Sequence, residues 1–311
     1  MQCPEPDRWS ELADPARRDE LELHLDACED CRALLAVLTQ AESPAAWAPE
    51  LASAGARIGR YVIERPLGAG GMGVVLAARD PQLERTVALK LVRIHDRTPA
   101  AIARARERLV AEARAMARLD HPNVVTVHEI VEDDRELVIV MERVDGADLG
   151  TWLAEAPRSR PERLRAILDA GRGLAAAHAA GLVHRDVKPA NILVDRAGRA
   201  RLTDLGLAAA IVGIDEPGFA RGSESRLVGT PGYLAPEVTA GARGDTCSDQ
   251  YAFAITARQA LFGDAPPRGR LANVLRRGCA DRASERFPSV AALLAAIERA
   301  QRPRWPIFAS G

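Results

Sequence analysis

The chain has 311 residues with 42 basic and 43 acidic side chains, so its formal net charge near neutral pH is −1. This balance gives no general attraction to nucleic acid or to anionic membranes, and we expect neither as a partner. Almost half of the residues are hydrophobic, which is enough for the cores of about two domains. No apolar run approaches the ~20 residues that span a bilayer, so the sequence predicts a cytoplasmic protein.

The N-terminal region contains a candidate metal site. Three of the five cysteines lie there, at Cys3, Cys28 and Cys31. Leucine spacing predicts a helix over residues 17–39, and His24, Cys28 and Cys31 fall on one face of that helix. One imidazole and two thiolates need a fourth ligand to close a tetrahedral Zn²⁺ site, and Cys3 is the candidate. The alternative is that Cys28 is a small core residue and Cys31 a free surface thiol.

An early Cys followed by H-x3-C-x2-C resembles the zinc-binding anti-sigma domain, a small helical module. The resemblance implies a helical zinc module over residues 1–40, with a structural Zn²⁺ and a sigma factor as its candidate partner. Residues 41–58 contain two prolines and no apolar periodicity, so we expect a linker there.

A glycine-rich run, G-A-G-G-M-G-V-V, occupies residues 68–75. Strand-like residues precede it at 61–63 and follow it at 74–76. We therefore expect a β-hairpin rather than the strand-to-helix turn of a dinucleotide fold. Glycines in such a turn let backbone N–H groups approach phosphates closely. Taken alone, an ordinary glycine hairpin is the alternative.

Two further segments, a strand and a helix, follow the glycine-rich run and carry charged side chains. Residues 87–90, V-A-L-K, form a short apolar strand that ends in one cation, Lys90. Periodicity then predicts a helix over residues 101–119, where the acidic side chains are Glu107 and Glu112. For Glu112 an exposed pair with an arginine of the same helix is the alternative.

The run H-R-D-V-K-P-A-N at residues 184–191 places a potential base, cations and a metal-binding amide in one short loop. Five fixed residues at this spacing are expected by chance about once in a few million positions. A second carboxylate, Asp204, begins D-L-G after a strand-like segment, and G-T-P-G-Y-L-A-P-E follows at residues 229–237. Carboxylates, an amide and cations in this arrangement favour phosphoryl transfer, which depends on positioning and on cationic stabilisation.

In this order and at these distances, the motifs resemble those of bacterial serine/threonine protein kinases of eukaryotic type. The resemblance covers residues 59–302 and implies an α+β, bilobal protein kinase fold, preceded by the helical zinc module. A β-rich small lobe would reach to about Val140, an α-helical large lobe would follow, and residues 303–311 would form a tail. The resemblance implies ATP-dependent transfer to Ser/Thr hydroxyls of proteins, including the kinase itself, in bacterial signalling.

The resemblance also implies roles for single residues. Asp186 would accept the proton of the substrate hydroxyl, and Lys188 would lie near the γ-phosphate. Lys90 would clamp phosphates with Glu112 as its ion-pair partner, because Glu112 lies at the usual distance before the H-P-N turn. Mg²⁺, or Mn²⁺, would bind at Asn191 and Asp204. Nucleotide contacts are implied for Gly68, Ala69, Gly70, Gly71, Met72, Gly73, Val75, Ala88, Lys90, Met141, Glu142 and Val144.

The resemblance also implies structural roles for residues outside the run 184–191. Thr230 would contact the Asp186 and Lys188 pair, Glu237 would pair with Arg286, and Asp249 would brace the catalytic loop. The histidines outside these motifs, His178 among them, show no partner pattern and are expected to be structural or exposed.

One stretch departs from the family pattern. Residues 262–286 are too few for the two helices and loops usual there, so the helix that commonly docks protein substrates is expected to be shortened or absent. Every motif residue needed for catalysis is present, which favours an active kinase. The alternative is a nucleotide-binding regulatory protein that sequesters a sigma factor through its zinc module.

Overall fold

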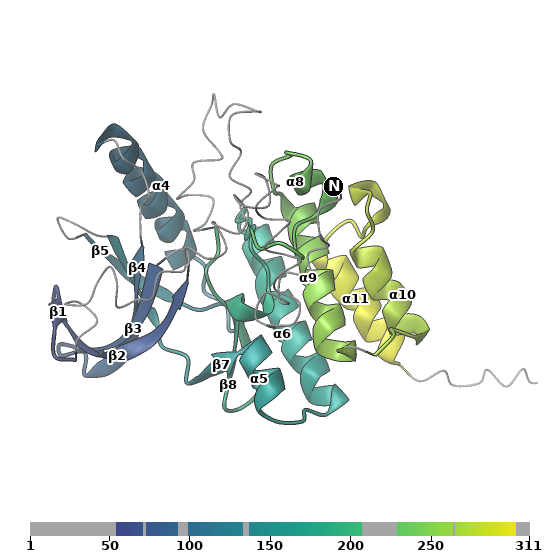
Figure 1. The fold of residues 1–311 in the computed structure, drawn as a ribbon, viewed down its shortest axis with the longest axis horizontal. Helices are drawn as coiled ribbons and strands as arrows, with labels where there is room; N and C mark the ends of the chain where they lie inside the picture. The colour runs from purple at the N-terminus through teal and green to yellow at the C-terminus, as the bar shows by residue number, and fades with distance from the viewer. Residues whose placement is uncertain are drawn as a thin grey trace, which may run out of the picture. The chain divides into compact units, whose positions relative to one another are not determined.

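The computed structural model describes residues 54–70, 73–92, 99–132, 137–206, 229–263 and 265–302. These residues divide into two compact units (Figure 1). Unit 1 takes its described residues from 54–92 and 127–143, and unit 2 from 99–126 and 144–302. No helix of the described part is both long and apolar enough to cross a membrane.

Unit 1 is built on an antiparallel sheet. Within the described ranges its strands are β1 (Arg57–Ile58), β2 (Tyr61–Gly70), β3 (Gly73–Asp80), β4 (Arg85–Val92), β5 (Val127–Glu132) and β6 (Leu137–Glu142). Their order across the sheet is β1-β2-β3-β4-β6-β5. β2 and β3 pair from Val62 with Arg79 to Gly70 with Gly73, so the expected glycine-rich hairpin is confirmed.

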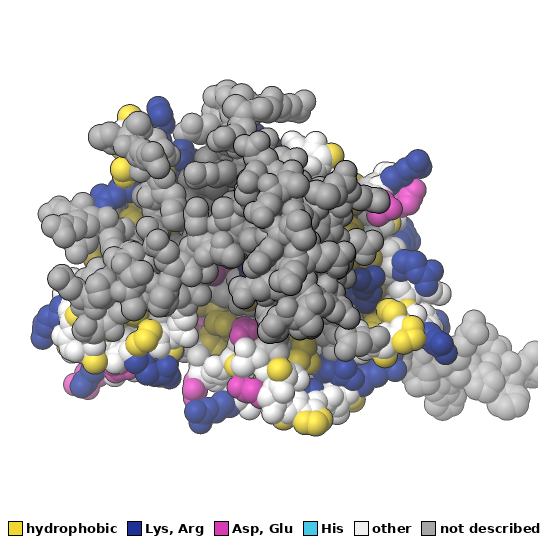
Figure 2. Space-filling view, in the orientation of Figure 1, with side chains coloured by type: hydrophobic (Ala, Val, Ile, Leu, Met, Phe, Trp, Pro, Cys, Tyr) yellow, Lys and Arg dark blue, Asp and Glu magenta, His cyan; other side chains and the backbone are white. Residues whose placement is uncertain are grey.

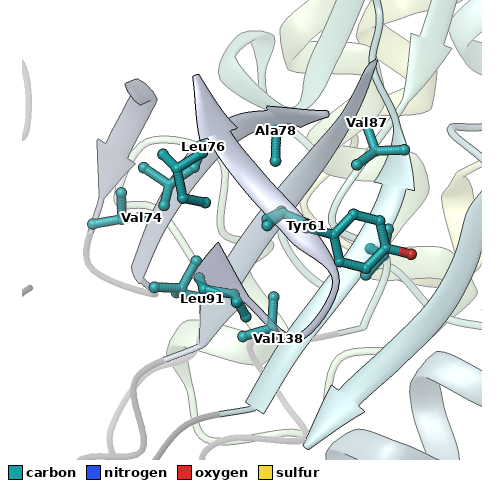
Figure 3. Packing of buried hydrophobic residues seen from close by; sticks show 11 residues of the cluster. Tyr61, Val74, Leu76, Ala78, Val87, Leu91 and Val138 are labelled. Atoms are coloured by element: carbon teal, nitrogen blue, oxygen red, sulfur yellow. The ribbon is translucent and has the colours of Figure 1, made fainter. Parts of the chain in front are cut away.

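One face of this sheet carries the hydrophobic core of unit 1. Successive residues of a strand point to opposite faces, so alternate positions share a face. One face forms the core cluster, and Figure 3 shows its side chains packed together. The cluster comprises Ile58, Tyr61, Ile63, Val74, Leu76, Ala78, Val87, Leu89, Leu91, Val138 and Val140. Removing one large member, as in Leu89→Ala, is expected to cost about 2–5 kcal/mol of stability.

Unit 2 is mainly helical, with a small sheet of order β7-β8-β9. Its described helices are α4 (Pro99–Ala117), α5 (Leu149–Glu155), α6 (Arg160–Ala179), α8 (Pro236–Thr239), α9 (Thr246–Phe262), α10 (Gly269–Gly278) and α11 (Val290–Gln301). The strands are β7 (Gly146–Asp148), β8 (Ile192–Asp195) and β9 (Ala200–Leu202), with 3-10 turns at Pro189–Asn191 and Ala283–Glu285.

Helix α6 is the centre of unit 2, since it packs against α9, α11 and β9. A capping box fixes its start: the Ser159 side chain accepts from the Glu162 backbone, and the Glu162 side chain accepts in return from the Ser159 backbone. Two glycines of α6 allow close packing. A Cβ on Gly171 would collide with Leu294, and a Cβ on Gly173 would collide with the Asn123 carbonyl.

Two element boundaries differ from the sequence expectation. Helix α4 begins at Pro99 and ends at Ala117, two residues before the expected bounds at each end. Proline fits the first turn of a helix because its missing N–H would have no helical partner there. Between α9 and α11 the described residues form one α-helix, α10, and the 3-10 turn, and the shortening relative to the family stays a prediction.

Candidate active site

Asp186 lies at the centre of the candidate site, in the loop between α6 and β8, and is 5% exposed. Three donors surround its carboxylate. The Lys188 ammonium lies 2.9 Å from Oδ2, the Thr230 hydroxyl donates to Oδ1 over 2.9 Å, and the Asn191 amide donates to Oδ2 over 3.0 Å. A carboxylate offers about four acceptor positions, so one acceptor position remains for a further donor.

Lys188 and Thr230 are joined to each other as well as to Asp186. The Lys188 Nζ donates to the Thr230 hydroxyl over 2.5 Å. Thr230 lies 44 residues beyond Asp186 in the chain, so the expected contact of this threonine with the Asp and Lys pair is present in the fold. The three side chains hold one another in a fixed arrangement.

Asn191 and Asp204 are the candidate metal ligands. Asn191 donates its amide hydrogens to the Asp186 backbone carbonyl over 2.7 Å and to the carboxylate, which leaves its side-chain oxygen as the available ligand atom. The Asn191 backbone carbonyl accepts from the Thr203 backbone over 3.0 Å, and this bond ties the loop to the residue before Asp204. Asp204 has a positive φ of 64°, which is uncommon for a residue with a side chain.

The residues after Asp204 are held against helix α4. Leu205 is buried, and Gly206 adopts φ +65° and donates to the His184 carbonyl over 3.2 Å. A Cβ on Gly206 would collide with the Glu112 carboxylate, so this glycine is needed for close approach as well as for its conformation. Glu112 therefore lies beside the D-L-G segment within unit 2.

Asp249 of α9 braces the loop. It is 1% exposed and accepts from the backbone N–H groups of His184 and Arg185, each over 2.7 Å. Its Oδ2 also lies 2.8 Å from His178 Nε2. Arg185 has φ +65°, so these bonds hold a strained residue directly before Asp186. Sequence reasoning missed His178, because its partner lies 71 residues away and no local pattern marks it.

The segment after Thr230 is anchored by a buried ion pair. Arg286 has a fully buried side chain and binds Glu237 through two bonds of 2.6 and 2.7 Å. It also donates to three backbone carbonyls, those of Ala280, Cys247 and Asp281. Burial raises the pKa of Glu237, but the bonds from Arg286 outweigh burial and hold the pKa below its ordinary value of 4.5.

We expect Glu237→Gln to lower the free energy of unfolding by about 2 kcal/mol at neutral pH, because the Arg286 charge loses its counter-ion. The loss is smaller than for a fully buried pair, since the Glu237 side chain is 27% exposed. A lowered folded-state pKa gives stability that is present above the unfolded pKa and lost as pH falls through the folded pKa. Urea unfolding of the wild type and of Glu237→Gln should therefore show a difference in the free energy of unfolding that becomes smaller as the pH falls into the acid range. A pH-independent difference would contradict the ion-pair explanation.

Unit 1 brings the candidate nucleotide residues together by strand register. Val75 pairs with Gly68 on one side and with Lys90 on the other, and Ala88 pairs with Met141. Directly paired residues share a face, and Ala88 and Lys90 are two positions apart on β4, so these side chains lie opposite the core cluster. Lys90 is 4% exposed.

Other predicted site residues are not brought together by the described structure. Lys90 belongs to unit 1 and Glu112 to unit 2, so their ion pair stays a prediction. Glu142 ends β6 in unit 1, and Val144 begins the next part of unit 2. Gly71 and Met72 lie outside the described residues, as do all four predicted zinc ligands, Cys3, His24, Cys28 and Cys31.

A sheet unit with a glycine-rich hairpin and a helical unit with the candidate site around Asp186 define the class of protein, a protein kinase. The family model for the protein kinase domain matches residues 61–291, and the chain therefore belongs to the protein kinase family. Members of this family transfer the γ-phosphoryl group of ATP.

Named relatives agree with this membership. The serine/threonine-protein kinase PkaB of Streptomyces coelicolor is 40% identical over 228 residues, which cover 70% of this chain and 52% of PkaB. PknA of Mycobacterium tuberculosis is 37% identical over 220 residues, covering 68% of this chain and 48% of PknA. The chain thus spans about half the length of these relatives. The crystal structure of the Mycobacterium tuberculosis PknI kinase domain matches with a TM-score of 0.62 at 31% identity, covering 80% of this chain and 99% of that one.

Proposed function

We propose that this protein is a serine/threonine protein kinase that transfers the γ-phosphoryl group of ATP to Ser and Thr hydroxyls of proteins, including its own. The observation that carries the proposal is the Asp186 carboxylate, which is fixed by three donors and keeps one acceptor position for a substrate hydroxyl. Relatives named as serine/threonine kinases support the choice of hydroxyl. ATP as the phosphoryl donor fits the cytoplasmic location that the sequence predicts.

In the proposed reaction the hydroxyl oxygen forms a bond to the γ-phosphorus, and the bond from that phosphorus to the bridging oxygen of ADP breaks. Asp186 orients the hydroxyl and accepts its proton. Lys188 lies 2.9 Å from Asp186 and places a positive charge where the phosphoryl oxygens carry negative charge. Thr230 bonds both residues and so limits their movement during transfer.

The remaining site residues are assigned to the nucleotide and its metal. Asn191 and Asp204 offer the oxygen ligands that Mg²⁺ or Mn²⁺ prefers, and such an ion supplies charge neutralisation of the phosphates. We assign phosphate contacts to the glycine-rich hairpin and to Lys90, and adenine contacts to Met141, Glu142 and Val144. Glu112 is assigned as the ion-pair partner of Lys90.

The direct test incubates the purified full chain with γ-labelled ATP, Mg²⁺ and a general protein substrate, followed by phosphoamino-acid analysis. We expect label on serine and threonine, both in the chain and in the substrate. Label on tyrosine alone would contradict the specificity. Binding of ATP without any transfer would favour the alternative, a nucleotide-binding protein that sequesters a sigma factor.

We further propose that residues 1–40 form a helical module held by one structural Zn²⁺ at Cys3, His24, Cys28 and Cys31. The support is the spacing of these residues in the sequence and the small size of the segment, which buries too little apolar surface to fold without a staple. On the anti-sigma resemblance, a sigma factor is the partner proposed for this module.

Elemental analysis of protein purified without chelators should show about one zinc per chain. Cys28→Ser should remove most of it, because the site loses one of four ligands. Cys247→Ser is the matched control: burial raises the pKa of the Cys247 thiol, which disfavours the thiolate that binds metal. A zinc-free wild-type chain whose first forty residues still resist proteolysis would contradict the module.

A further inference from the structure

Helix α10 and the residue before it form a strongly basic surface. Four arginines and no acidic residue occur in this stretch, and all four are exposed. We call them the α10 arginine face: Arg268, Arg270, Arg276 and Arg277. Lys and Arg side chains are prominent at the right of Figure 2, over the region where Figure 1 places α10 and α11.

The described contacts of this face leave its charge uncompensated. Arg277 stacks over the Phe287 ring at 4.4 Å and donates to the backbone carbonyl of Glu285 over 3.2 Å. Arg270 donates to the Arg299 carbonyl and Arg276 to the Asn273 side chain.

These contacts use neutral acceptors, so among the residues that the structure describes no carboxylate pairs with the face. The neighbouring Glu285 carboxylate lies 3.7 Å from Arg282 instead. The face therefore presents several positive charges to solvent, and two of its guanidinium groups are oriented by main-chain carbonyls.

The same chain carries a stretch of opposite charge. Residues 19–30, D-E-L-E-L-H-L-D-A-C-E-D, contain six acidic side chains and no Lys or Arg. The imbalance extends over the whole N-terminal region. The first 53 residues hold 12 acidic and 4 basic side chains, whereas the remaining 258 hold 31 acidic and 38 basic ones. The small net charge of the chain thus conceals two oppositely charged parts.

We propose that the acidic stretch 19–30 docks on the α10 arginine face of its own chain. The proposal goes beyond the phosphoryl transfer reaction and does not depend on it. Charge complementarity selects this occupant, because the stretch and the face are of similar length and each has a single sign of charge.

A covalent tether favours the contact within one chain. The 13 residues 41–53, between the proposed zinc module and Ala54, can extend to about 45 Å. A compact protein of about 250 residues has a radius of gyration of about 18 Å, so this reach is comparable to the diameter of such a protein. A tether of this length also gives the second group an effective concentration of about millimolar, far above that of a free partner at micromolar levels.

Exposed ion pairs are individually weak and are screened by salt, so the docked state should be reversible and salt-sensitive.

The docked state can be detected by a crosslink between an amine on the face and a carboxylate of the acidic stretch. The chain has only two lysines, Lys90 and Lys188, and neither is on α10. Arg276→Lys keeps the charge of the face and adds one amine, which a water-soluble carbodiimide can join to a nearby carboxylate as an amide with loss of water.

In the full-length Arg276→Lys protein we expect an intramolecular crosslink from the introduced amine to a carboxylate of residues 19–30, identified by peptide mass spectrometry. Its yield should fall about tenfold between about 0.1 M and 1 M salt, as the Debye length falls from ~10 Å to ~3 Å. Adding Arg268→Glu and Arg270→Glu should remove most of the crosslink, because both substitutions reverse exposed charges of the face.

Arg196→Lys is the matched control. Arg196 is 82% exposed and lies 3.0 Å from Asp145, so its replacement should crosslink to Asp145 and not to residues 19–30. This product also shows that the reagent works at each salt concentration. The proposal is overturned if the Arg276→Lys amine reaches residues 19–30 no more often than the control amine does. A crosslink found only between two chains, seen as a doubled mass, also overturns it.

Discussion

Asp186→Asn is expected to lower the rate of phosphoryl transfer by about 10³-fold, because the substituted amide cannot accept the hydroxyl proton. The three groups around the carboxylate, from Lys188, Asn191 and Thr230, all donate. The asparagine side chain would turn one NH₂ hydrogen toward one of these donors, so the loop also loses a favourable bond. That loss is worth about 1–2 kcal/mol, which leaves the protein folded.

The measurement is the initial rate of label transfer from γ-labelled ATP, with circular dichroism to verify folding. Asp145→Asn is the control, since Asp145 is an exposed residue of unit 2 whose pairing with Arg196 is a surface contact. Its rate should stay close to wild type. A folded Asp186→Asn protein with an unchanged rate would remove Asp186 from the mechanism, and with it the proposed function of this loop.

Asp249→Ala should reduce both stability and activity. The substitution leaves the buried N–H of His184 and the partly buried N–H of Arg185 without an acceptor, and it removes the contact with His178. The two unsatisfied donors and the lost contact together cost about 3 kcal/mol. Arg185 is then free to leave its strained φ of +65°, which displaces Asp186. A displacement of about 1 Å at a reacting group lowers the rate by about 10²-fold.

Urea unfolding and the transfer assay on the same preparations test this expectation. His178→Gln is the matched control, because it alters one of the three Asp249 contacts and leaves both backbone bonds intact. We expect it to cost no more than about 1 kcal/mol and to keep most of the activity. If Asp249→Ala costs no more than His178→Gln, the backbone bonds to Asp249 do not stabilise the loop.

Two buried charged residues, Asp249 and Arg286, place the candidate site in a well-packed part of unit 2. Asp249 holds the loop from helix α9, and Arg286 holds Glu237 from beyond α10. Both are buried charged groups whose partners satisfy them, which is the condition under which buried charge is tolerated. The loop of residues 184–191 is therefore positioned by side chains to which we assign no part in the transfer reaction.

The sequence by itself determined the parts of the site that lie close together in the chain. Asp186, Lys188 and Asn191 fall within six residues, so their spacing alone places a carboxylate, a cation and an amide in one loop. The glycine-rich hairpin could also be predicted, because turn residues flanked by strand-like residues act locally. Family resemblance, rather than any local pattern, supplied the distant partners Thr230, Asp249 and Arg286.

Only the tertiary structure decided how these distant residues meet. His178 reaches Asp249 because helices α6 and α9 pack together. This packing depends on Gly171, since a Cβ there would collide with Phe253 of α9. The contact of Glu112 with the D-L-G segment likewise depends on Gly206, which has no side chain to block it. Hydrogen bonds between residues about 70 positions apart follow from the packing of whole helices, so local spacing in the sequence cannot specify them.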